Sequence, residues 1–107
     1  MAFDGERLNV CIIMPFILKK SDKPNKKFMV IHENKKIYFG DSKYQDYTQH
    51  NDDKRKSMYI LRHKKNEDWN DKNTSGFWAR WILWEKKTID EAIKDLRKKN
   101  VYIIDSR

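Results

Sequence analysis

Two apolar stretches separated by polar residues lie within residues 27–40, and in the first of them Phe28, Val30 and His32 alternate with Met29, Ile31 and Glu33, as the two faces of a β-strand do. The two halves of this stretch, KFMVIHE and KIYFG, flank Asn34, a residue type that tolerates the positive φ of a tight turn. The pattern therefore predicts a β-hairpin that ends at Gly40.

Two further strands are predicted near the ends of the chain. The apolar run VCIIMPFIL predicts a buried or half-buried strand over residues 9–18, and Pro15, which lacks an amide hydrogen, places it at a sheet edge or ends it. The charged segment KKSDKPNKK predicts a loop over residues 19–27. VYII at residues 101–104 predicts a final strand, which we expect to pair with residues 10–14.

A polar loop and a basic helix are predicted after the hairpin. The loop, DSKYQDYTQHNDD, begins at Asp41, and Asn51 or Asp52 in it can cap a helix that runs to about residue 65. The apolar residues expected on the inner side of this helix are Met58, Tyr59 and Leu61.

The stretch SGFWARWILWEKKT, residues 75–88, holds three of the four tryptophans and predicts a second helix, capped by Thr74 or Ser75. It is apolar around nearly its whole circumference, which is typical of a buried helix. An exposed aromatic platform for stacking bases is the alternative. Arg80, the one charged residue between Phe77 and Trp84, would then lie on an aromatic surface or reach a partner.

The segment TIDE at residues 88–91 is a capping box that predicts a third helix, which ends near Asn100. Its apolar face is formed by Ile89, Ala92, Ile93 and Leu96. We therefore expect an α+β fold, in which a hairpin and one or two further strands pack on two or three short helices. Residues 1–26 are expected to form a divergent N-terminal strand and charged loop, and residues 27–107 a single α+β domain.

Composition limits the classes of function. A chain of 107 residues with 38% hydrophobic residues suffices for one core. Its longest apolar run has nine residues, whereas a membrane helix needs about 20, and no signal-peptide cleavage pattern follows it. We expect neither membrane insertion nor secretion. The single cysteine, Cys11, excludes an internal disulfide and indicates a reducing compartment.

The net charge of +8 favours a polyanionic partner, although an AT-rich genome also encodes many lysines. DNA or RNA is the expected partner, bound by charge neutralisation, and a merely solvated helix face is the alternative. The residues expected to contact phosphates are Lys54, Arg55, Lys56, Arg62, Lys64 and Lys65. The residues expected to stack on bases are Tyr44, Tyr47 and Arg80.

No catalytic motif stands out. The chain has no zinc-ligand spacing, HExxH, GxGxxG or P-loop pattern, so no catalytic residue, metal or cofactor is expected. A divalent-metal nuclease built on Asp46, His50 and Asp52 is the weakest alternative. The oligomeric state does not follow from the sequence.

Four motifs resemble a small uncharacterised domain family of large double-stranded DNA viruses of protists and algae. They are KKIYFG, DYTQHND, RKSMYILRH and SGFWARWILWEKKT with the following EAIKD, and the resemblance extends from Lys27 to about Asp95. The chain departs from the family pattern at Tyr38, where histidine is usual. The resemblance implies a viral protein of the host cytoplasm or nucleus, or one packaged in the virion, with no known catalytic residues.

The resemblance also selects the residues that matter for the family. These are Gly40, Asp46, Tyr47, Thr48, His50, Arg55, Tyr59, Arg62, His63, Phe77, Trp78 and Trp84. A buried network of Asp46, His50 and Arg62 would account for several of them equally well. The main alternative function is a structural virion component, such as a minor capsid or cement protein, that contacts neighbouring virion proteins.

Overall fold

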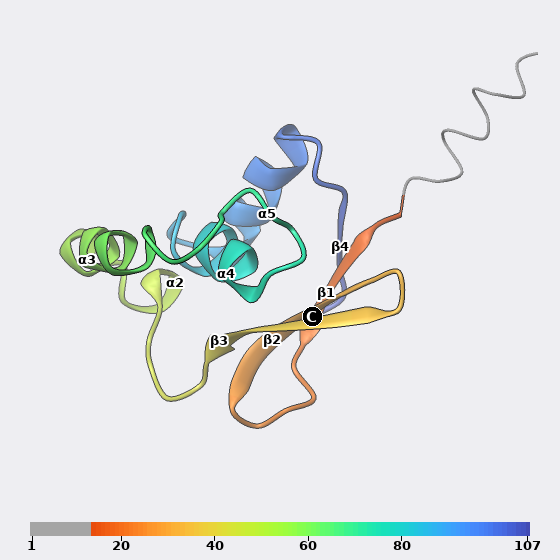
Figure 1. The fold of residues 1–107 in the computed structure, drawn as a ribbon, viewed down its shortest axis with the longest axis horizontal. Coiled ribbons are helices and arrows are strands. Elements are labelled where there is room, and N and C mark those ends of the chain that lie inside the picture. Colours follow the sequence, from red (N-terminus) through yellow and green to blue (C-terminus); the bar gives the residue numbers. More distant parts are fainter. Residues whose placement is uncertain (1–13) are drawn as a thin grey trace, which may run out of the picture.

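The computed structural model of the protein describes residues 14–107 and confirms the α+β class. Four strands form one mixed sheet in the order β3-β2-β1-β4, and the helices gather beside it (Figure 1). The strands are β1 (Phe16–Lys20), β2 (Lys26–His32), β3 (Lys35–Asp41) and β4 (Ile103–Asp105). The helices are α2 (Tyr47–His50), α3 (Asp53–His63), α4 (Ser75–Trp78), the π-helix η1 (Ala79–Leu83) and α5 (Ile89–Lys98).

The predicted hairpin is confirmed. Strands β2 and β3 are antiparallel, and Val30 pairs with Ile37. The two turn residues are Glu33 and Asn34, with φ of 50° and 69°. Positive φ at both central positions is the requirement of a type I′ turn, whose twist matches that of the flanking strands.

The first strand lies inside the sheet, so of the two expectations for Pro15, an edge position and a strand boundary, the edge position is wrong. Strand β1 starts directly after Pro15, which therefore removes no ladder hydrogen bond. It pairs antiparallel with β2 on one side and parallel with β4 on the other. Lys19, Lys20 and Lys26 belong to strands, which shortens the predicted loop to residues 21–25.

Strand β4 confirms the predicted final strand and pairs with residues 16–18. Apart from Met14, its predicted partner, residues 10–14, lies outside the described residues, as does Cys11. Leu18 of β1 is 1% exposed and belongs to the common core. Strand β1, assigned from sequence to a separate segment of residues 1–26, thus shares one sheet with residues 27–107.

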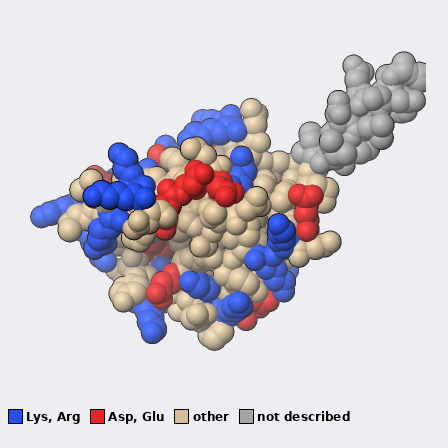
Figure 2. Space-filling model, in the orientation of Figure 1, with Lys and Arg blue, Asp and Glu red and all other residues tan. Residues whose placement is uncertain are grey.

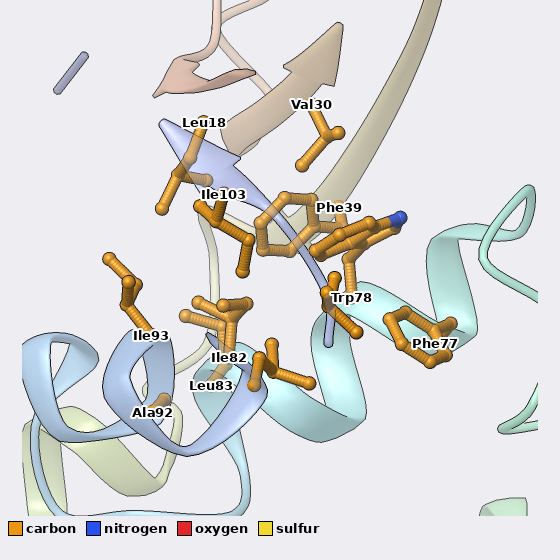
Figure 3. Packing of buried hydrophobic residues seen from close by; sticks show 12 residues of the cluster. Leu18, Val30, Phe39, Phe77, Trp78, Ile82, Leu83, Ala92, Ile93 and Ile103 are labelled. Atoms are coloured by element: carbon orange, nitrogen blue, oxygen red, sulfur yellow. The ribbon is translucent and has the colours of Figure 1, made fainter. Parts of the chain in front are cut away.

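The tryptophan-rich segment fills the core, as expected of a helix that is apolar nearly all round. Trp78 and Ile82 are fully buried, and Figure 3 shows them with Leu83 near Phe39 and Ile103 of the sheet. Thr74 caps α4 by accepting a hydrogen bond from the Phe77 amide. The stretch is therefore mainly a core element.

Regular α-helical geometry does not continue through this segment. The Trp84 amide donates to the Ala79 carbonyl at 3.1 Å, five residues back, which is π-helical spacing. The extra residue in this turn changes the direction of the side chains after it. Trp81, within this turn, and Trp84, directly after it, lie at the margin of the core and are partly buried.

Helix α5 has the predicted start, face and end. The Thr88 hydroxyl accepts from the Glu91 amide at 3.1 Å, and Asn100 ends the helix with a φ of 68°. Its buried residues are Ala92, Ile93 and Leu96. Within residues 14–107, no helix combines the length and apolar character that crossing a bilayer requires.

Helix α3 begins as predicted but faces a different way. The Asp52 carboxylate caps it by accepting from the amides of Lys54 and Arg55. Tyr59 is 7% exposed, whereas Met58 and Leu61 are 47% and 70% exposed. The prediction that Met58 and Leu61 lie on the inner side is therefore wrong. Tyr59 alone of the three is buried.

Candidate nucleic-acid interface

The loop before α3 contains a short helix, α2, built on a buried carboxylate. Asp46 is 4% exposed and caps α2 by accepting from the Thr48 amide. The Lys27 ammonium donates to Asp46 Oδ2 at 2.7 Å and to Gln49 Oε1 at 2.6 Å. Gln49 also accepts from the Asp46 amide, which completes a capping box. This network ties α2 to the start of β2.

The buried network expected around Asp46 therefore has different members. Lys27 and Gln49 take the place of Arg62, which is exposed on α3. His50 Nδ1 accepts a hydrogen bond from the amide of Asp52, the N-cap residue of α3, at 2.9 Å. This bond of His50 is made to the start of α3 and not to Asp46. Burial and the charge of Arg55 lower the His50 pKa below its usual value.

Aromatic stacking fixes α3 against the segment that follows η1. The Tyr59 ring is stacked between His63 and Trp84, and its centroid lies 4.2 Å from each of theirs. His63 Nδ1 donates to the Tyr59 carbonyl at 2.9 Å, since a carbonyl only accepts. Burial of the Tyr59 hydroxyl raises its pKa well above the usual range.

Two of the predicted contact residues help to anchor α3 instead of facing outward. The Lys56 ammonium donates to the Glu85 carbonyl at 2.8 Å and lies 4.9 Å from the Tyr47 ring centroid. Tyr47 is 4% exposed, and its hydroxyl donates to Asp53 Oδ1 at 2.5 Å. That hydrogen bond to the carboxylate raises the Tyr47 pKa. Lys56, expected to contact a phosphate, is thus bonded within the protein, and the ring of Tyr47, expected to stack on a base, is buried.

Arg80 is also occupied within the protein. It is 8% exposed, and its guanidinium lies 4.4 Å from the Trp81 ring centroid and 2.7 Å from Glu85 Oε1. Of the two expectations for Arg80, the structure supports a position on an aromatic surface. Its charge is neutralised by Glu85, so it adds nothing to the outer basic face.

The remaining basic residues on and directly after α3 form an exposed cluster, which we call the α3 basic face. It consists of Lys54, Arg55, Arg62, Lys64 and Lys65, all exposed. Figure 2 shows lysine and arginine side chains gathered at this end of the molecule, with other basic groups over α5 and the sheet. Within residues 14–107 none of the five forms an ion pair.

A pocket of about 720 Å³ opens beside this face, which we call the α3 pocket. Its walls include Arg55, Met58 and Arg62 from α3, with Leu83 and Trp84 opposite them. Tyr44, from the loop after β3, also lines the pocket and is 69% exposed. The predicted contact residues Tyr44, Arg55 and Arg62 are thereby brought together.

The acidic and histidine residues do not assemble into a ligand set. Among the described residues, no three His, Cys, Asp or Glu side chains are placed to hold a metal ion. Asp46 is bound to Lys27, His50 Nδ1 accepts an amide hydrogen, and Asp52 caps α3. The three residues considered for a nuclease thus have structural partners.

Fold and site define a small α+β domain with a basic helix beside a partly apolar pocket. Residues 16–63, fewer than half of the chain, match a family of unknown function (DUF5754). The match runs from β1 to the end of α3 and includes Tyr44, Arg55 and Arg62. Residues 64–95, which also contribute motifs to the resemblance described from the sequence, lie outside this match. Neither a curated protein nor a solved structure matches the chain.

Proposed function

We propose that this protein is a non-catalytic nucleic-acid-binding protein whose α3 basic face contacts phosphates. One observation supports this most: five exposed cations lie on or directly after one helix, and none has an ion-pair partner among residues 14–107. Such cations release counterions when they neutralise phosphates, which drives association.

The proposed mode of binding has modest sequence preference. Phosphate contacts orient a protein on nucleic acid but read no base, whereas sequence is read at base edges. DNA and RNA both offer the required phosphates. The partner is therefore a class of polymer rather than one sequence.

A viral setting is part of the proposal, and it rests on the resemblance of the four motifs to proteins of large DNA viruses. The protein would then act in the host cytoplasm or nucleus, or be packaged with the genome. A structural virion role is the second candidate. Strand β4 lies at a sheet edge, and Tyr102 and Ile104 beside and within it are 52% and 37% exposed. An exposed edge of this kind can pair with a neighbouring subunit.

Matched charge reversals test the proposal. The variant Lys54→Glu/Lys65→Glu removes charge from the α3 basic face, and Lys94→Glu/Lys98→Glu makes the same change on exposed positions of α5. We expect the α3 variant to bind a labelled single strand and its duplex at least about tenfold more weakly than the α5 variant. Equal losses in both variants, or no binding by the unmodified protein at low salt, would contradict the proposal.

A further inference from the structure

The α3 pocket combines an apolar interior with two guanidinium groups that have no ion-pair partner among residues 14–107. Arg55 and Arg62 both line it and lie seven residues apart on α3, about 10.5 Å along the helix axis. Lys27 and Asp46, which also line it, neutralise each other. Asp41 is the remaining carboxylate of the lining, so the unpaired charge of the pocket is positive.

The interior of the pocket suits a planar, uncharged group. Met58, Leu83 and Trp84 provide apolar surface between the two arginines and the body of the protein. The volume of about 720 Å³ falls within the range of small-molecule sites, which is roughly 300–1,000 Å³. The ring of Tyr44, 69% exposed, is available for stacking.

We infer that the α3 pocket receives one unstacked base of a single-stranded nucleic acid, while Arg55 and Arg62 bind the phosphates on either side of it. This inference rests on the proposed function and specifies its substrate. A duplex base is paired and stacked, and withdrawing it costs a few kcal/mol. A single strand presents its bases at lower cost, so the pocket selects single strands over duplexes.

The recognised chemistry is a flat aromatic base flanked by anions. An acidic peptide would satisfy Arg55 and Arg62 but brings no ring for Tyr44 or for the apolar interior. Base–aromatic stacking tolerates every base, because each has a π-face. The pocket therefore distinguishes nucleic acid from other polyanions without reading a sequence.

Three labelled probes of equal length test the inference by fluorescence anisotropy at one low salt concentration: a single strand, the same backbone with abasic sites, and a duplex. We expect the single strand to bind at least about fivefold more tightly than the other two, the lower bound of what one stacked base contributes. Tyr44→Ala should remove most of this preference and leave abasic binding unchanged.

A matched pair of double variants locates the preference. Arg55→Ala/Arg62→Ala should weaken single-strand binding at least about tenfold and abolish the preference over the abasic strand. Lys54→Ala/Lys65→Ala removes the same charge from positions of the α3 basic face that do not line the pocket, and should weaken all three probes by one common factor. Circular dichroism verifies that both variants are folded.

The outcomes separate this inference from the proposed function. Equal affinity of the unmodified protein for all three probes overturns base insertion and leaves phosphate binding standing. Failure to bind any probe at low salt overturns both. An oligoglutamate peptide of equal charge that competes as well as the single strand overturns the assignment to nucleic acid, whereas weaker competition supports it.

Discussion

The Tyr59 ring lies parallel to the Trp84 ring, with the centroids 4.2 Å apart and the planes 3° from parallel. Tyr59 belongs to α3, and Trp84 directly follows η1, so this contact joins the basic helix to the core. Met58 and Leu61, next to Tyr59 in the helix, remain exposed. This aromatic pair therefore helps to set the orientation of the α3 basic face, together with the contacts of Lys56 with Glu85 and of Tyr47 with Asp53.

Removing that ring should destabilise the protein. We expect Tyr59→Ala to lower the free energy of unfolding by about 3 kcal/mol, because it deletes a buried aromatic side chain and its stacking with Trp84. Urea denaturation followed by circular dichroism measures the change. Tyr59→Phe keeps the ring and serves as the control, with an expected loss below about 1 kcal/mol. Similar losses in both variants would show that the hydroxyl, not the stack, stabilises α3.

The ion pair of Lys27 with Asp46 can be separated from the helix cap that Asp46 provides. Asp46→Asn preserves an N-cap oxygen but leaves the Lys27 ammonium, 13% exposed, without its carboxylate. We expect Asp46→Asn to cost about 2 kcal/mol and Asp46→Ala about 3 kcal/mol in thermal or urea unfolding. If Asp46→Asn were as stable as the unmodified protein, the ion pair would contribute nothing.

Glu85 should make the free energy of unfolding depend on pH in the acid range. Burial alone raises its pKa, but the hydrogen bond and charge of Arg80, with Lys56, outweigh burial and leave the pKa below the usual 4.5. The unfolded chain therefore binds the proton first, and the contribution of Glu85 is present above pH 4.5 and lost as pH falls through the folded-state pKa. We expect Glu85→Gln to be less stable by about 1–2 kcal/mol near neutral pH. If Glu85→Gln were still less stable than the unmodified protein in strong acid, the proposed link between Glu85 and the pH dependence would be disproved.

His50 should add a second pH dependence nearer neutrality. Its pKa is lowered below 6.5 by burial and by Arg55, so the unfolded chain takes up the proton first. Stability is then fully present above pH 6.5 and falls below it. We expect His50→Gln, which does not titrate, to flatten this part of the stability curve. An NMR titration that gave His50 a pKa above 6.5 would refute the explanation.

Local signals in the sequence predicted most of the secondary structure. Asn34 marked the hairpin turn, Thr88 marked the start of α5, and Asn100 marked its end. Turns and helix caps of this kind are formed by residues close together in the chain, so the local sequence suffices to predict them. The short helix α2 was missed although its capping box, Asp46 with Gln49, is visible in the sequence. Its length of four residues gave no hydrophobic period to recognise.

Long-range contacts were beyond prediction from one sequence. Lys27 and Asp46 lie on different elements, and nothing local to either residue indicates the other. Arg80 was expected to meet a base, but the π-helical turn and Glu85 enclose it. The prediction of the inner face of α3 was wrong because the helix has few apolar residues to indicate it. The helix turns Tyr59 inward to stack on Trp84, and this orientation leaves Leu61 exposed.

The central claim is that nucleic acid binds at the α3 basic face and its pocket. Mapping of amide and indole chemical shifts during titration with a short single strand tests it most directly. We expect saturable shifts that are concentrated in residues 43–65 and at the Trp84 indole, and that are weakened by Arg55→Ala/Arg62→Ala. Shifts concentrated on α5 or β4, or no saturable shifts at low salt, would contradict it.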